Sequence, residues 1–194
     1  MTPAKESSEG LPELLTLEPV IEAVREGVEG AGWSMSGLQK TTSQELQGRW
    51  AGATSRSAYL FFHRPDVFDD AAIDVYLDEG RRGLSGNLAL VLEGKDLGDL
   101  GPIPSLLDSL SAYADARLPD RYKIPLTLRF RVDPRSPDAV DAAEPEVRFK
   151  VRIPQAAFRA GAGAVAELAV LAVRSFEALL GEPGVEAFRL PPSE

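Results

Sequence analysis

Leu-Thr-Leu-Arg-Phe-Arg-Val at residues 126–132 and Val-Arg-Phe-Lys-Val-Arg-Ile at residues 147–153 are the two stretches that decide the fold. Apolar and polar residues alternate strictly in both, which is the pattern of strands that bury one face of a sheet. Their other face is almost wholly basic and carries Arg129, Arg131, Arg148, Lys150 and Arg152. The sequence therefore predicts two half-buried antiparallel strands with a cationic outer face.

A hairpin between these strands brings like charges together. With Val132 opposite Val147, the basic residues of one strand face those of the other, Arg129 against Lys150 and Arg131 against Arg148. Like charges directly opposite each other destabilise a sheet unless carboxylates neutralise them. We therefore expect acidic groups over this face, supplied by a neighbouring element of the chain, by a second copy, or by a different molecule.

One acidic stretch within the chain is a candidate for that role. It contains Asp66, Asp69, Asp70, Asp74, Asp78 and Glu79, whose spacing does not match a calcium-binding loop. In a strand over 72–78, Ile73, Val75 and Leu77 point to one face while Asp74, Tyr76 and Asp78 point to the other. This alternation favours pairing of the carboxylates with the arginines of the later hairpin over a metal site.

The rest of the chain alternates between helical and strand patterns. Thr16 is a candidate N-cap for a helix that Gly30 and Gly32 end, and a second helix runs from Pro102 to Pro119. Between them we expect strands at 33–39, 44–51, 57–64, 72–78 and 86–93, with 34–49 forming either one long bent strand or two. A third helix is expected over 155–180, and its stretch 164–173 is apolar nearly all round, which is typical of a helix buried on more than one side.

These elements predict the α+β class: an antiparallel sheet with flanking helices, in the order α-βββ(β)-α-ββ-α. With 194 residues, 44% of them hydrophobic, the chain is long enough for one core. We expect a flexible N-terminal arm at 1–12, a single domain at 13–180, and an irregular C-terminal tail at 181–194. Val185, Phe188 and Leu190 give that tail apolar side chains with which to dock.

Composition narrows the classes of function. Thirty acidic against 21 basic residues give a net charge of −9, which argues against general affinity for phosphate backbones and favours basic partners. There is no cysteine, so disulfides and thiolate chemistry are excluded. The first ten residues lack a secretory signal and no apolar run reaches the ~20 residues of a membrane span, so we expect a soluble, cytoplasmic protein.

No motif in the sequence indicates a reaction. His63 is the only histidine; as a general base it needs an orienting carboxylate such as Asp66, Asp69 or Asp70, and alone it cannot form a multi-histidine metal site. The segment Gly161-Ala162-Gly163 superficially matches a dinucleotide-binding loop, but it follows an antiparallel strand and falls several residues inside the third predicted helix. We therefore expect no enzymatic activity, no cofactor and no bound metal.

Direct binding of nucleic acid also finds little support. Phe130 and Phe149 are the aromatic residues nearest to the cations, and the alternation puts both on the apolar face. Proteins that bind single strands expose aromatic rings among their basic groups. The basic face of the hairpin lacks such rings within its own two strands.

The order of elements resembles a known fold. A leucine-rich helix before a two-strand hairpin, the small size and the acidity together resemble the class I type III secretion chaperones and the YbjN family, which shares their fold. The resemblance covers about residues 16–180 and concerns topology. The chain is longer than this pattern, because it adds the N-terminal arm, the acidic connection at 133–146 and the C-terminal tail. These additions make the resemblance to the YbjN family preferable to that with the secretion chaperones. The resemblance implies a non-enzymatic homodimer that holds segments of partner proteins on apolar patches of its sheet.

The leading hypothesis is therefore a dimeric, chaperone-like protein-interaction module. Its client is expected to be a basic protein, for example a nucleic-acid-binding protein of DNA metabolism. The candidate contacts with a partner or second subunit are Leu106, Leu110, Tyr113, Arg129, Arg131, Arg148, Lys150, Arg152, Val170 and Val173. The alternative is a protein that binds a small ligand between its last helix and a curved sheet, in a cavity lined by Trp33, Trp50, Tyr59, Phe61 and Tyr76.

Overall fold

The computed structural model describes residues 15–47, 50–65, 67–95, 100–130 and 145–189 of the chain. Arg131 and Val132, Leu190 and the N-terminal arm lie outside these ranges. The helices and strands, in chain order, are α1 (Leu17–Gly30), β1 (Ser34–Gln47), β2 (Trp50–Arg64), β3 (Phe68–Gly80), β4 (Gly83–Glu93), α2 (Ile103–Arg117), β5 (Lys123–Arg129), β6 (Glu146–Arg152), α3 (Gln155–Ala160), α4 (Ala162–Leu180) and α5 (Pro183–Phe188).

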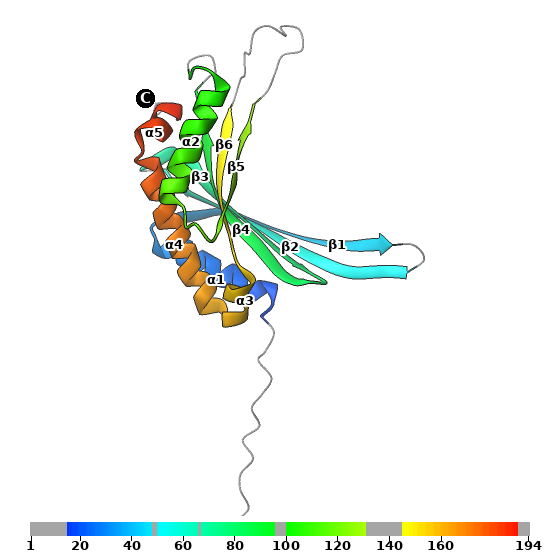
Figure 1. The fold of residues 1–194 in the computed structure, drawn as a ribbon. Helices are drawn as coiled ribbons and strands as arrows, with labels where there is room; N and C mark the ends of the chain where they lie inside the picture. The colour runs from blue at the N-terminus through cyan, green and yellow to red at the C-terminus, as the bar shows by residue number, and fades with distance from the viewer. Residues whose placement is uncertain (1–14, 48–49, 66, 96–99, 131–144, 190–194) are drawn as a thin grey trace, which may run out of the picture.

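The strands form one six-stranded sheet in the order β1-β2-β3-β4-β6-β5, and every neighbouring pair is antiparallel. The helices lie together on one side of this strongly twisted sheet, and the β1–β2 hairpin extends far beyond them (Figure 1). The α+β class with an antiparallel sheet and flanking helices is thus confirmed.

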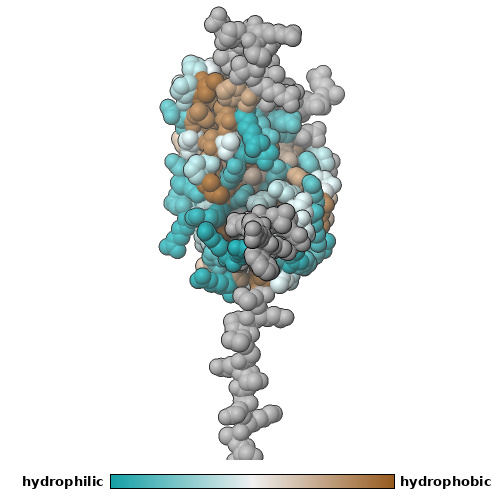
Figure 2. All heavy atoms as spheres, turned by 90° about the vertical axis from the view of Figure 1, so that its right-hand side faces the viewer, coloured by the Kyte–Doolittle hydropathy of each residue, from teal (hydrophilic) through white to brown (hydrophobic). Residues whose placement is uncertain are grey.

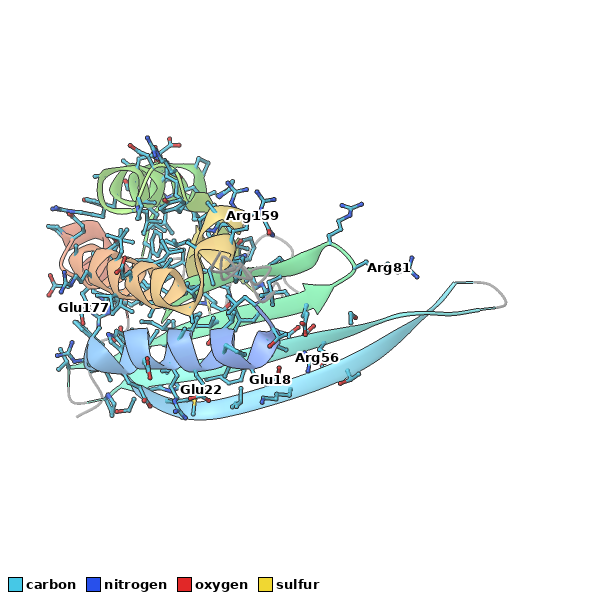
Figure 3. All side chains as sticks on the ribbon, turned by 90° about the horizontal axis from the view of Figure 1, so that it is seen from below. Glu18, Glu22, Arg56, Arg81, Arg159 and Glu177 are labelled. Atoms are coloured by element: carbon cyan, nitrogen blue, oxygen red, sulfur yellow. The ribbon has the colours of Figure 1, made fainter. Side chains whose placement is uncertain are left out.

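The core lies between the helices and one face of the sheet. Alternate strand residues such as Leu60, Val75, Leu88 and Val151, which are partners across β2, β3, β4 and β6, are fully or almost fully buried there. Figure 3, seen from below, shows α1 and α4 lying across this face. At their crossing, a Cβ atom at Gly27 would lie only 2.6 Å from the carbonyl oxygen of Ala166. Small residues therefore let the two helices approach closely.

The structure decides between the two alternatives for 34–49 in favour of one long strand, and it corrects one prediction about register. The ranges 33–39 and 44–51 do not form two separate strands, because β1 runs unbroken from Ser34 to Gln47 and pairs along β2, with register shifts between Met35 and Gly37 and between Gln44 and Leu46. The predicted hairpin register is wrong. Arg129 lies opposite Glu146, four residues from its predicted partner Lys150, and β5 begins at Lys123 and ends at Arg129; the irregularity between Ile124 and Thr127 shifts the ladder by one residue only.

The third predicted helix is broken. Gly161 has φ 103°, a left-handed backbone conformation that glycine adopts at little cost, and it separates α3 from α4. The segment Gly161-Ala162-Gly163 therefore begins a helix and does not lie inside one, but it follows the antiparallel strand β6 and the short helix α3. The parallel strand-loop-helix unit that a dinucleotide site requires does not occur at this place.

The segment after Gly181 is not irregular, because Pro183–Phe188 forms α5. Val185 and Phe188 are fully buried, which confirms them as docking side chains. Phe188 lies against Gly94, where an added Cβ atom would lie 2.3 Å from the ring. The Lys95 amide donates to the Phe188 carbonyl at 2.9 Å, and Arg189 forms an ion pair with Asp70. These contacts join the end of the described chain to β3 and β4.

Candidate functional site

The face of the sheet opposite the helices, called here the open face, carries no described helix. Its side chains stand in rows across the strands, as the ladder partners show. One row contains Tyr59, Tyr76, Asn87 and Arg152; the next contains Phe61, Asp74, Ala89 and Lys150; a third contains His63, Ala72, Val91 and Arg148. Aromatic residues thus occupy β2 and β3, small residues occupy much of β4, and cations occupy β6.

This arrangement creates connected hollows over β4. The first has a volume of about 230 Å³ and is lined by Tyr59, Phe61, Asp74, Val75, Tyr76, Asn87, Ala89, Arg129, Arg148 and Lys150. The second, of about 570 Å³, shares Tyr76 and Asn87 with the first and extends past Arg152 to Gln155. The third, of about 620 Å³, shares Ser85 and Gln155 with the second and reaches Arg81 and Arg82 at the β3–β4 turn. Neighbouring hollows thus share lining residues, and the three together are called here the trough.

A group of ion pairs crosses the middle of the open face. Arg148 donates to Asp74 at 2.9 Å and to Glu146 at 2.6 Å, so its side chain reaches over β4 from β6 to β3. The expectation that Asp74 neutralises an arginine of the later hairpin is confirmed. Asp78 instead accepts a hydrogen bond from Ser57 at 2.7 Å.

Burial and pairing act in opposite directions on Asp74. Its removal from water raises the pKa of the carboxyl, and the attraction of Arg148, which lowers it, is the smaller effect. The pKa of Arg148 is raised, chiefly by its hydrogen bond to Glu146. The ion-paired group is therefore an ordered part of the trough floor, held at some cost in desolvation.

Most other cations on this side have no carboxylate partner among the described residues; Arg129 has only a long contact with Glu146. Lys150 donates a hydrogen bond to the Thr127 hydroxyl at 3.1 Å, and Arg129 lies 3.8 Å from Glu146, which Arg148 already engages. Within the described ranges, no ion pair involves Arg81, Arg82, Lys150 or Arg152. Figure 3 shows Arg81 beyond the end of the β3–β4 hairpin, away from the helices.

The sequence predicts the aromatic residues Tyr59, Phe61 and Tyr76 together, but as part of a cavity under the last helix and not on the open face. Tyr59 and Tyr76 form a tilted ring pair with centroids 4.9 Å apart, and Phe61 lines the same hollow. Phe149 is buried on the core face, as predicted, but these rings from other strands stand beside the cations. The alternation of Asp74, Tyr76 and Asp78 places Tyr76 on this face, whereas the unbroken apolar run Leu60-Phe61-Phe62 hides the direction of Phe61.

The aromatic cavity expected between the last helix and the sheet is not assembled. Trp33 is buried on the helix side, where it stacks on Phe68 at 5.9 Å and donates to Glu177 at 3.1 Å. Tyr59, Phe61 and Tyr76 lie on the opposite face of the sheet. The side chain of Trp50 lies outside the described part. The predicted lining residues therefore do not share one site.

The candidate contact residues are distributed over both sides of the molecule. Leu106, Leu110 and Val173 are buried in the core, and Tyr113 and Val170 are partly exposed on the helix side. Tyr113 packs against Gly184 of α5. The structure brings Arg129, Arg148, Lys150 and Arg152 together on the open face.

His63 contacts a hydroxyl group. Its Nδ1 lies 2.7 Å from the Ser36 Oγ, which also donates to the Phe61 carbonyl at 3.2 Å. Of the carboxylates considered for orienting His63, Asp70 pairs with Arg189 and Asp66 lies outside the described residues. The ordered geometry around His63 is thus a serine–histidine contact at the edge of the open face.

Two further properties of the described residues bear on the site. Their histidine and carboxylate side chains form no group of three or more that could hold a metal ion. None of their helices combines the length and apolar character needed to cross a bilayer.

Figure 2, seen from the side toward which the β1–β2 hairpin projects, shows a hydrophobic area at the upper left next to hydrophilic side chains. The site is therefore a shallow, mixed surface of aromatic, small and cationic side chains. Comparison with protein-family models, with curated proteins and with solved structures finds no match for the chain.

Proposed function

We propose that this protein is a non-enzymatic interaction module that holds a segment of a partner protein on the open face. The observation that carries the proposal is the trough over β4, bounded by Tyr59, Phe61 and Tyr76 on one side and by the cations of β6 on the other. Sheets in two-layer folds cover one face with helices, and a second face that keeps aromatic side chains at the surface is typical of a binding surface.

The shape of the site favours a polypeptide over a small molecule. The hollows are open and follow one another along β4, which suits an extended chain. Tyrosine supplies a large contact area at little cost in conformational entropy, because its ring has few rotatable bonds. Tyr59, with 39% of its surface exposed, remains available for such a contact.

The proposal includes a homodimer. β1 and β5 are the two edges of the described sheet, and each leaves one side of its backbone unpaired. Edge strands pair readily with a second chain, and most soluble homo-oligomers are two-fold symmetric. Sedimentation equilibrium tests this part: the proposal predicts twice the chain mass of 20.9 kDa, and a single-chain mass at micromolar concentration contradicts it.

Selection from a displayed library of random extended peptides tests the binding function. We expect the wild-type chain to select peptides, and the double variant Tyr59→Ala, Tyr76→Ala to lose them. Leu171→Ala is the matched control, because Leu171 on α4 is 44% exposed and lies on the helix side. Peptides that bind the double variant as tightly as the wild type, or a failure to select any peptide, would contradict the proposal.

A further inference from the structure

The charge of the trough differs from the charge of the whole chain. The chain carries −9, which on its own predicts a basic partner. On the open face, however, the carboxylates that line the hollows already have partners: Asp74 is engaged by Arg148 and Asp78 by Ser57. Ser57 is neutral, so Asp78 has no oppositely charged partner. It is outnumbered by the cations on this surface that form no ion pair in the described part, Arg81, Arg82, Lys150 and Arg152.

These cations lie along the trough. Lys150 lines the first hollow, Arg152 the second, and Arg81 with Arg82 the third. The hollows share lining residues, so the four side chains border one continuous surface. Lys150 is partly buried and has no carboxylate partner among the described residues, while Arg81, Arg82 and Arg152 are exposed, so all four can pair with a ligand that supplies carboxylates.

We propose that the segment held on the open face is an extended acidic peptide, with carboxylates directed at Lys150 and Arg152 and apolar side chains directed at Tyr59, Phe61 and Tyr76. This inference rests on the proposed function and specifies its partner. In an extended chain successive side chains point to opposite sides, so acidic residues alternating with apolar residues match the two sides of the trough. The stretch Ser85–Val91 of β4 sets a length of about seven residues at ~3.4 Å each.

A single-stranded nucleic acid fits this surface less well. Its phosphates would run beside Asp74 and Glu146, since both carboxylates lie within the β3 to β6 part of the open face. Tyr59 and Tyr76 also pack on each other, and are not spaced as separate platforms for successive bases. A peptide that carries all of its carboxylates along one side can keep them away from Asp74 and Glu146.

Fluorescence anisotropy with labelled peptides of defined sequence tests the inference. The probes are a peptide in which glutamate alternates with valine, the same peptide with lysine in place of glutamate, and an oligothymidylate of similar length. For the wild-type chain we expect the glutamate peptide to bind about tenfold more tightly than the lysine peptide, and added salt to reduce the difference.

Charge reversal locates the effect. We expect the variant Lys150→Glu, Arg152→Glu to lose binding of the glutamate peptide and to bind the lysine peptide instead. The matched control is Arg159→Glu, Arg174→Glu, which makes the same change in net charge on α3 and α4 and should leave the preference unchanged. Circular dichroism checks that each variant is folded. The variant Lys150→Gln, Arg152→Gln is a milder second test, for which we expect a reduced affinity for the glutamate peptide.

The outcomes separate the two proposals. Equal binding of both peptides, abolished by Tyr59→Ala with Tyr76→Ala, overturns the acidic preference and leaves the interaction module standing. Binding of neither peptide, or binding that the tyrosine variant leaves intact, overturns both. Oligothymidylate that binds more tightly than the glutamate peptide overturns the acidic peptide in favour of a nucleic acid.

Discussion

At the scale of residues, Asp74 shows how the open face combines pairing with burial. The carboxylate is bound to Arg148, yet desolvation outweighs this attraction and the pKa of Asp74 is raised. A carboxyl whose pKa is higher in the folded state than in the unfolded state binds more protons when folded. Its contribution to stability is therefore fully present below its unfolded pKa and is lost as the pH rises through its folded pKa.

The variant Asp74→Asn removes this titration. We expect the free energy of unfolding of the wild type, relative to the variant, to fall as the pH is raised from below the ordinary aspartate range to neutrality. Urea unfolding at a series of pH values measures this difference. A wild-type chain that gains stability over Asp74→Asn across the same pH range would show that the ion pair with Arg148 outweighs burial.

A second residue-scale prediction concerns the ion pair between Arg189 and Asp70. Both side chains are largely buried, with 15% and 11% of their surfaces exposed, and the Arg189 guanidinium lies 5.5 Å from the Phe68 ring centroid. Removing one partner leaves a buried charge uncompensated, so we expect Asp70→Ala to cost about 3 kcal/mol of stability.

The exposed pair Arg25–Glu22 is the control for this measurement. Its side chains are 40% and 55% exposed, so Glu22→Ala should cost less than about 1 kcal/mol. Chemical denaturation of both variants provides the comparison. Equal losses from the two substitutions would show that the Asp70 pair is no more important than a surface contact.

The sequence predicts these residue contacts unevenly. Alternation in the stretch 72–78 is enough to place Asp74 on the face that meets Arg148. Alternation pairs Arg129 with Lys150, whereas the structure pairs it with Glu146, four residues away along β6. The irregularity between Ile124 and Thr127, which contains Pro125, accounts for a shift of one residue only. Proline cannot donate a hydrogen bond to the ladder, and alternation alone does not reveal where such a shift occurs.

At the scale of elements, the crossing of α1 and α4 depends on the absence of a side chain at Gly27. An added Cβ atom would lie 2.6 Å from the Ala166 carbonyl oxygen and 2.9 Å from the Ala169 Cβ atom. The Ala166 carbonyl is part of the α4 backbone and cannot shift at a low cost in energy. The two helices must therefore separate to admit a larger residue at position 27.

We expect Gly27→Val to destabilise the protein by about 1–3 kcal/mol, as overpacking of a core does. Gly30→Ala in the same helix is the control, because no atom lies within 4 Å of its added Cβ. Thermal unfolding of both variants measures the difference. A Gly27→Val protein as stable as the control would show that the two helices do not pack as closely as described.

The docking of α5 gives a further prediction at this scale. Phe188 is fully buried against Gly94. The sequence predicts an irregular segment in place of α5, because Pro183 and Pro191 flank a stretch too short for a clear helical period. We expect Phe188→Ala to cost about 3–5 kcal/mol, the usual loss for a buried phenylalanine. Urea unfolding that gives less than about 1 kcal/mol would mean that α5 contributes little to the core.

At the scale of the whole molecule, the sequence predicts the order of the strands and of the first two helices, but not the break at Gly161 or the helix α5. The helix boundaries at Thr16 and Pro119 follow from caps and prolines, and the core face follows from alternation. The open face is harder to predict, because its aromatic and cationic residues come from strands far apart in the chain. Only the strand order β3-β4-β6 brings Tyr76 and Lys150 to opposite sides of Ala89.

A titration of the uniformly ¹⁵N-labelled chain with the glutamate–valine peptide, followed by amide NMR shifts, tests the central claim most directly. The account predicts that saturable shift changes gather in β3, β4 and β6, around Tyr76, Ala89 and Lys150, and that α1 and the outer side of α4 near Leu171 stay unchanged. Shift changes confined to the helices, or none at millimolar peptide, would contradict it.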